Sequence, residues 1–401
     1  MQRGEAGRLA EVFAVFLKLG LTSFGGPIAH LGYFREELVQ RRRWLSDHAY
    51  ADLVALCQFL PGPASSQVGM GIGLLRAGLP GLLAAFLGFT LPSAVAMVAF
   101  GLGFAMLGAD LSGGWLAGLK AAAAAVVAQA VLGMARGLCP EPRTQTIALV
   151  GAAIALGLGG MAGQLSAIAV GALAGAFFIR AAAPQEATEL PDLAVSRGLA
   201  TVALALFFVL FAVLPLLAAG AEGALRLFDA FYRAGALVFG GGHVVLPLLD
   251  AETVATGLVS REAFLAGYGA AQAVPGPLFT FAGFLGAVAE RPPSGVAGGV
   301  LALAAIFLPS ALLVVGALPF WAQLRSLGAA RRVLAGVNAA VVGLLGAALW
   351  NPVLPEGVTS PATAVVALLA FLALVVWRVP AFAVVAGAAV AGLAIPGLAS
   401  P

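Results

Sequence analysis

Long stretches of this chain contain no charged side chain, and their lengths match those of membrane crossings. A helix needs ~20 apolar residues to span a bilayer, and nine runs of 21 to 36 residues lack Asp, Glu, Lys and Arg. The longest runs can hold two short helices each. The alternation typical of strands is not found, so the pattern predicts an all-α polytopic membrane protein. The runs are 53–75, 77–109, 144–179, 198–221, 263–289, 292–324, 333–355, 357–377 and 379–401.

One set of motifs occurs twice, about half a chain apart. The offset between the copies is 214 to 217 residues, and it is 218 where Lys120 matches Asn338. Apolar segments interrupted by Gly and Pro at matching positions of two halves point to the substrate site of a transporter. The first copy contains Lys18-Leu19-Gly20, Phe24-Gly25-Gly26-Pro27, Gln58, Pro61-Gly62-Pro63 and Leu91-Pro92-Ser93. The second contains Arg233-Ala234-Gly235, Phe239-Gly240-Gly241-Gly242, Gln272, Pro275-Gly276-Pro277 and Leu308-Pro309-Ser310.

A polar, Pro-containing stretch divides the chain into two halves. We interpret 182–197 as a linker between an N-terminal transport repeat, 1–181, and a C-terminal one, 198–401. Four Arg follow the first Gly-rich turn, whereas two acids and a single Arg occupy the matching loop, and basic loops favour the cytoplasm. We therefore expect inverted-topology repeats whose Pro-Gly-Pro breaks meet near the midplane; a parallel duplication with an acidic cytoplasmic loop is the alternative. The loop residues are Arg35, Arg41, Arg42, Arg43, Asp250, Glu252 and Arg261.

The two Pro-Gly-Pro elements predict broken helices. Pro cannot donate a backbone hydrogen bond and Gly tolerates conformations that end a helix, and such a break is tolerated in lipid only where protein or an aqueous cavity surrounds it. The half-helix after each break would aim free N–H groups at that cavity, which favours an anion. The alternative is a kinked helix whose hydroxyls bond to its own carbonyls. The polar side chains beside Gly62 and Gly276 are Gln58, Ser65, Ser66, Gln67, Gln272 and Thr280.

The Gly-rich turns admit two interpretations. Such turns can form backbone nests for anions, and they can equally serve as tight helix junctions. A His beside each turn raises a proton-transfer role, although the two His do not occupy matching positions. The turn residues considered for substrate binding are Gly25, Gly26, Gly240 and Gly241, and the two His are His30 and His243.

Four cations lie inside or at the edges of apolar runs, where an ionisable side chain is costly and indicates function. Lys18 and Arg233 occupy matching positions, and we assign them to the substrate site. The alternative is that these side chains extend to the headgroups. Nearby acids are few, with Asp47 and Asp52 the nearest, which favours a small anion as the ligand. A proton or gating role is considered for His30, His243, Arg76, Lys120 and Asn338.

Composition excludes several classes of protein. The chain is 61% hydrophobic and 10% charged, far from the roughly one-quarter charged residues of a soluble domain. No hydrolase, zinc-protease or phosphate-loop motif is present, so we expect no enzyme activity, no cofactor and no metal. The net charge of +3 comes from loop Arg and does not indicate a nucleic-acid partner. Cys57 and Cys139 have no metal-ligand spacing.

The chain resembles the chromate ion transporter family in its long, two-domain form, and the resemblance covers both halves. It implies efflux of chromate from the cytoplasm across the bacterial inner membrane by a multi-pass protein, with sulfate as a mimic. A homodimer remains open. The motifs are 24–27 with Ala29-His30, Arg42-Arg43-Trp44-Leu45, 56–63 with Ser65-Ser66-Gln67, Arg76-Ala77-Gly78, 89–93, 239–248 and 267–277.

The driving force of such efflux follows from charge. When a dianion leaves a cytoplasm that is ~100 mV negative, about 4.6 kcal/mol is released, from about 2.3 per charge. This energy corresponds to roughly three decades of concentration ratio. The potential is therefore sufficient, and proton antiport is not required. The alternatives are a transporter for another anion such as sulfate, and an anion channel. A membrane-embedded chromate reductase would need a redox cofactor, for which no motif is found.

Overall fold

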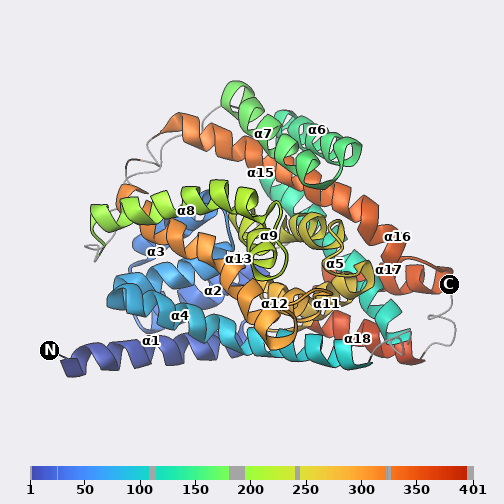
Figure 1. Ribbon diagram of the computed structural model, residues 1–401, viewed down its shortest axis with the longest axis horizontal. Helices are drawn as coiled ribbons and strands as arrows, with labels where there is room; N and C mark the ends of the chain where they lie inside the picture. Colours follow the sequence, from blue (N-terminus) through green and yellow to red (C-terminus); the bar gives the residue numbers. More distant parts are fainter. Residues whose placement is uncertain are drawn as a thin grey trace.

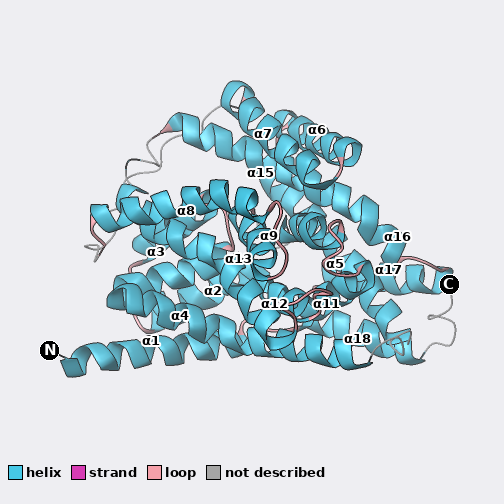
Figure 2. Cartoon of the chain, viewed as in Figure 1, coloured by secondary structure: helices cyan, strands magenta, loops and turns pink. Residues whose placement is uncertain are grey.

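The computed structural model describes residues 2–24, 26–107, 114–179, 195–239, 244–321, 323 and 327–394, and within this part of the chain all regular structure is helical (Figures 1 and 2). The first half contains α1 (Gln2–Thr22), α2 (Gly26–Phe34), the π-helical segment η1 (Arg35–Arg41), α3 (Asp47–Phe59), α4 (Ala64–Leu107), α5 (Gly114–Leu138), α6 (Pro142–Leu158) and α7 (Gly160–Phe178). The second half begins with α8 (Arg197–Ala218), α9 (Ala224–Ala236), α10 (Val245–Leu249), the π-helical segment η4 (Asp250–Val254) and α11 (Arg261–Ala273). It continues with η5 (Leu278–Thr280), α12 (Phe281–Ala287), α13 (Gly295–Ala317), η6 (Leu318–Phe320), α15 (Gly328–Ala348), η7 (Leu349–Val353), α16 (Leu354–Gly357), α17 (Pro361–Val375) and α18 (Ala381–Ala394).

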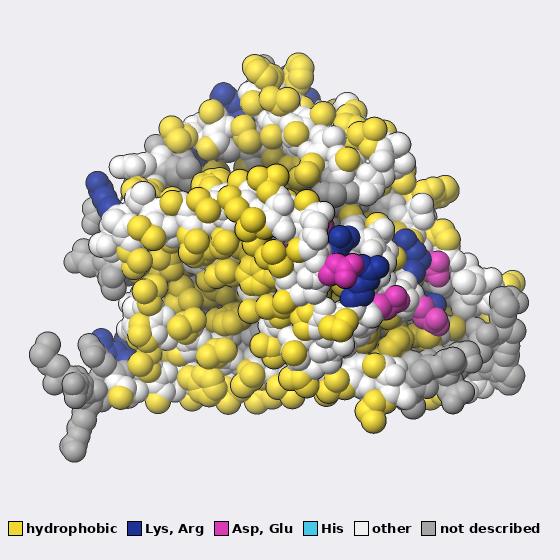
Figure 3. Space-filling model, viewed as in Figure 1, with side chains coloured by type: hydrophobic (Ala, Val, Ile, Leu, Met, Phe, Trp, Pro, Cys, Tyr) yellow, Lys and Arg dark blue, Asp and Glu magenta, His cyan; other side chains and the backbone are white. Residues whose placement is uncertain are grey.

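The surface has the character of a protein in lipid. Large apolar side chains such as Leu149, Phe177 and Leu216 are more than two-thirds exposed, which water does not favour and a bilayer does. Figure 3 shows a mostly hydrophobic face on which acidic and basic side chains gather in one group beside α9 and above α11, with separate basic side chains at the left edge and the top. Within the described residues, five helices are long and apolar enough to cross a membrane. The chain is an all-α, multi-pass membrane protein, as the uncharged runs predict.

Helix α4 is two arms joined by a turn. Its 44 residues are more than twice what one crossing needs, and the helical conformation is lost at Ala77 and Gly78, where φ is −148° and +66°. The arms fold back on each other where Gly73 and Gly81 meet backbone to backbone. A Cβ at either glycine would strike the other arm. The chain therefore makes a tight helical hairpin directly after Arg76.

Long helices pack in the same way in both halves, and each half contributes a helix pair to the other. Helix α5 packs against α17 and α18, whereas α15 packs against α6 and α7 (Figure 1). Gly118 of α5 abuts the Ala388 carbonyl, and Gly336 of α15 abuts the Gly171 carbonyl. Both residue pairs match across the repeat offset. Small residues permit this close backbone approach in the absence of a hydrophobic driving force, and the exchange interlocks the two halves.

Candidate functional site

The two Pro-Gly-Pro breaks bond reciprocally to the opposite half. The Gly62 N–H donates to the Val238 carbonyl at 2.7 Å, and the Gly276 N–H donates to the Ser23 carbonyl at 2.9 Å. Ser23 and Val238 are themselves matching positions. Two equivalent bonds of this kind are what a two-fold relation between the copies produces. These two N–H groups are bonded to protein, and anion binding by the half-helices that follow the breaks remains a prediction.

Gly is required at both breaks. Gly62 and Gly276 have φ of +125° and +97°, a region that side chains disfavour. A Cβ on Gly62 would collide with the Ser310 hydroxyl, and one on Gly276 would lie 2.9 Å from the Ser93 hydroxyl. Ser93 and Ser310 end the matching Leu-Pro-Ser motifs. All four motifs therefore meet where the halves cross.

Three of the six polar side chains beside the breaks bond to protein. The Thr280 hydroxyl donates to the Pro277 carbonyl at 2.8 Å, and the Gln67 amide donates to the Pro61 carbonyl at 2.7 Å. The Ser65 hydroxyl lies 3.2 Å from Nδ1 of the buried His30. The Ser66 hydroxyl is buried without a partner. The alternative in which hydroxyls bond to nearby carbonyls thus describes Thr280.

A cavity of about 280 Å³ opens where the Gly-rich turn of the first half meets the Pro-Gly-Pro break of the second. Gly26 and Pro27 lie on one side and Gln272 and Gly276 on the other. A water molecule occupies ~30 Å³, so the space admits a small polyatomic ion. The remaining lining residues come from α5, from the end of α11 through η5, and from the end of α17 through the start of α18: Val126, Gln129, Ala271, Val274, Leu278, Leu374, Arg378, Val379, Pro380 and Ala381.

The polar side chains of this cavity are one guanidinium and two amides, each of which can donate hydrogen bonds. Arg378 supplies a guanidinium, Gln129 and Gln272 supply amides, and Nε2 of Gln272 is buried without a hydrogen-bond partner. Among the described residues no acid lines the cavity and no ion pair reaches Arg378. A guanidinium and two amide N–H groups, with no carboxylate beside them, favour an anion. The cavity gathers Gly26, Gln272 and Gly276 of the predicted site; the other predicted residues that the structure describes lie elsewhere.

Sequence reasoning missed Arg378 and Gln129. A usable signal existed for Arg378, because it is the single charge between the uncharged runs 357–377 and 379–401. Its backbone has φ of +55°, and the Val379 N–H closes the turn onto the Ala373 carbonyl at 2.9 Å. Gly is the usual residue at this position after a helix. An Arg at a position where the backbone favours Gly indicates that its side chain has a function.

The matching cations Lys18 and Arg233 already have carboxylate partners. Lys18 Nζ lies 3.5 Å from Glu37, and Arg233 Nη2 lies 2.8 Å from Glu252. Glu37 and Glu252 are matching positions too, on the π-helical segments η1 and η4. The acids nearest these cations are therefore Glu37 and Glu252, not Asp47 and Asp52. Contact of Lys18 and Arg233 with a substrate remains a prediction.

The other predicted residues lie apart from the cavity. Arg76 pairs with Glu11 at 3.4 Å and lies over the Trp44 ring, 5.1 Å from its centroid. Lys120 lies 3.8 Å from Glu262, and Oδ1 of Asn338 is buried without a partner. Gln58 is exposed at the end of α3. Gly25, Gly240, Gly241 and His243 lie outside the described residues.

The fold and the cavity define a class: a multi-pass helical membrane protein with duplicated broken helices and a donor-lined cavity at their crossing. The family model for the chromate transporter matches the chain twice, over residues 10–179 and 225–393. The chain therefore belongs to the chromate transporter family, which points to a transporter and not to an enzyme. No solved structure matches it.

Full-length relatives support the same assignment. A chromate transport protein of Pseudomonas aeruginosa is 32% identical over 351 residues, covering 84% of this chain and 79% of the relative. A probable chromate transport protein of Synechococcus elongatus is 29% identical, with 84% and 82% covered. A chromate transport protein of Cupriavidus metallidurans is 27% identical, with 85% and 82% covered.

Proposed function

We propose that this protein exports chromate from the cytoplasm across the bacterial inner membrane, and that the cavity at Arg378 binds the ion. The observation that carries the proposal is the convergence of one unpaired guanidinium and two amides between the Gly26 turn and the Gly276 break. Family membership supplies the substrate class. Chromate is a tetrahedral dianion whose oxygens accept hydrogen bonds in many directions, which suits several donors and a single cation.

The crossing of the halves gives this site a route to both sides of the membrane. In transporters with inverted repeats, one repeat moves against the other around a site at their interface. We propose that the two-fold relation lies in the membrane plane, since the Arg-rich loop of the first half has an acidic counterpart in the second. Residues 1–181 and 198–401 would then form the two repeats. The bonds of Gly62 to Val238 and Gly276 to Ser23 lie at this interface.

The membrane potential is a sufficient driving force in this proposal. Export of a dianion moves negative charge outward, and ~100 mV inside-negative supplies about 4.6 kcal/mol at about 2.3 per charge. One bound guanidinium leaves the complex with a net negative charge, so the loaded carrier still responds to the potential. Sulfate has the same shape and charge, and competition decides which dianion binds better.

Uptake of labelled chromate into inverted membrane vesicles tests the proposal. Arg378→Met removes the guanidinium with little change in side-chain length, and we expect at least a tenfold loss of uptake because a charged hydrogen bond is worth about 1.5–3 kcal/mol. Arg291→Met is the matched control, because Arg291 lies in an exposed pair with Glu222 at 3.6 Å. Sulfate, phosphate and molybdate serve as competitors. Uptake by the Arg378 variant equal to that of the control would contradict the proposed site.

A further inference from the structure

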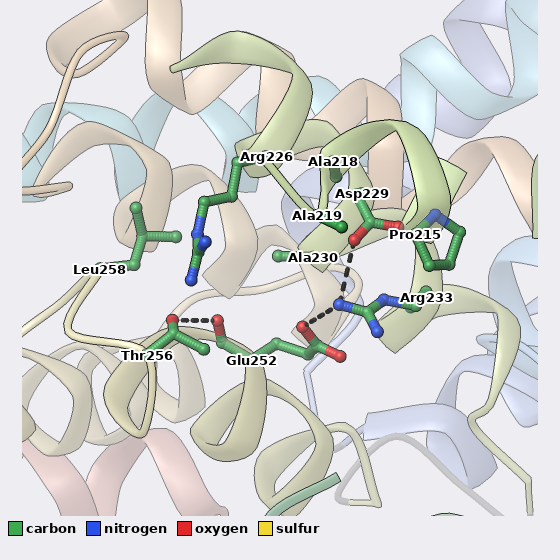
Figure 4. A pocket seen from close by; sticks show the side chains of 10 residues that line it. All are labelled: Pro215, Ala218, Ala219, Arg226, Asp229, Ala230, Arg233, Glu252, Thr256 and Leu258. Atoms are coloured by element: carbon green, nitrogen blue, oxygen red, sulfur yellow. Dashed lines mark hydrogen bonds and ion pairs between the residues drawn. The ribbon is translucent and has the colours of Figure 1, made fainter. Parts of the chain in front are cut away.

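A second cavity, of about 130 Å³, contains a group of charged side chains that the anion site does not use. Arg233 lies between two carboxylates, and its Nη2 is 3.0 Å from Asp229 and 2.8 Å from Glu252 (Figure 4). Both carboxylates thus contact the same nitrogen and lie close to each other. Arg226 enters the same cavity, and no ion pair reaches it within the described part of the chain.

Both acids are buried, and each has an oxygen that is not satisfied. Their side chains are 4% exposed, and Oδ1 of Asp229 and Oε1 of Glu252 have no hydrogen-bond partner. Two carboxylates that share one site cannot both ionise easily, because like charges raise each other's affinity for a proton. Arg233 contacts both acids and can compensate one of them, whereas Arg226 faces the same cavity without an ion pair to either in the described part of the chain. A proton on either free oxygen would neutralise the other.

We propose that Asp229 and Glu252 form a proton-binding site that holds one exchangeable proton between them. The proton adds to a free carboxylate oxygen and gives a neutral carboxyl beside an ionised one, which leaves the ionised carboxylate paired with Arg233. Thr256 lines the same cavity and is exposed, so the site has a path to solvent. Burial raises the pKa of Glu252 to about 7 and Arg233 opposes this, which is consistent with exchange near neutral pH.

The surroundings contain few other groups that titrate. Among the elements packed against η4, helix α11 contributes Arg261, which bonds to Asp250 at 3.0 Å, and Glu262, which pairs with Lys120. Helices α7 and α10 contain no acid or base, and α8 lines the cavity only with apolar residues at its end. The charged groups that face Glu252 from α9 are Arg226, Asp229 and Arg233.

Infrared difference spectroscopy of the purified full-length protein in lipid tests the site without transport. We expect the C=O stretch of a protonated carboxyl to vanish as pH rises through neutrality, and to be lost in both Glu252→Gln and Asp229→Asn. The matched control is Asp250→Asn, which alters a partly buried acid of the same π-helical segment, paired with Arg261. It should keep the band. A band that is absent, or unchanged in both Glu252→Gln and Asp229→Asn, would overturn the proposal.

A transport arm asks whether the proton is used, and this part rests on the proposed function. In inverted vesicles held at zero potential by a potassium ionophore, we expect a pH gradient to change chromate uptake at least twofold. Glu252→Gln should abolish that response and keep potential-driven uptake. An unaltered response in Glu252→Gln would refute the coupling. Absence of chromate uptake under any condition would refute the proposed function and leave the infrared result standing.

Discussion

The charged groups around Glu37 and those around Glu252 contain the same cation–acid pair at matching positions, but they differ in the number of acids and cations that contact it. In the first half Glu37 contacts three cations, Lys18, Arg41 and Arg42, at 2.9–3.5 Å. In the second half one cation contacts two acids: Arg233 contacts Asp229 and Glu252. We call the matching cation–acid pair the frame: it is Lys18 of α1 with Glu37 of η1 in the first half, and Arg233 of α9 with Glu252 of η4 in the second.

Three substitutions between the copies produce the difference. Ala14 of the first half matches Asp229 of the second, and Arg41 and Arg42 match Thr256 and Gly257. The hydrogen bond from Arg42 holds the pKa of Glu37 below its ordinary value, whereas burial raises that of Glu252 to about 7. The same backbone frame therefore keeps one acid ionised and places the other near its titration point. We infer that a duplicated frame need not carry a duplicated function.

The largest expected effect concerns the cation of each frame. Arg233→Met would remove the guanidinium that contacts both buried carboxylates, and breaking a buried pair in this way costs about 3–5 kcal/mol. Lys18→Met should cost less than about 1 kcal/mol, because Lys18 is 58% exposed and exposed pairs contribute little. Thermal unfolding in detergent measures both. Equal losses of stability in the two variants would show that the two cations contribute equally to the stability of their halves.

A companion variant separates lost charge from lost packing. Asp229→Asn added to Arg233→Met removes one of the two acids, and we expect it to restore part of the unfolding temperature. Without any recovery, the cost of Arg233→Met would lie in packing and not in charge.

A smaller effect, equal in both halves, is expected at the Pro-Gly-Pro breaks. Gly62→Ala and Gly276→Ala each place a Cβ against a serine hydroxyl of the other half at a positive φ. Strain of this kind costs about 1–3 kcal/mol. Gly103→Ala is the control, because a Cβ there meets nothing within 4 Å. Unfolding temperatures lowered in only one variant would argue against equivalent breaks.

The sequence predicts which positions of the two halves match better than it predicts which side chains contact one another. The offset of 214 to 217 residues matches Lys18 with Arg233 and Gly62 with Gly276, and the structure gives each pair equivalent contacts. That Glu37 reaches Lys18 depends on the course of the chain through η1, and an apolar pattern does not encode it. The sequence likewise does not reveal that α5 packs with α17 and α18. Small residues permit close approach of any helix and therefore do not specify which helix is the neighbour. Arg378 was readable as an isolated charge, but its cavity was not.

The smallest effect is a difference in pH dependence that has opposite sign in the two halves. For Glu252 the folded pKa of about 7 lies above the ordinary 4.5. The folded state therefore binds more protons between these values, and stability falls as pH rises from about 4.5 to about 7. For Glu37 the folded pKa lies below 4.5, so its contribution is present above 4.5 and is lost as pH falls further. Unfolding temperatures from pH 4 to 8 should show Glu252→Gln flatter than the wild type up to about pH 7. Glu37→Gln should approach the wild type only at the acid end. A Glu252→Gln profile parallel to the wild type across this range would mean that Glu252 stays ionised, as Glu37 does, and that the two clusters do not differ in protonation.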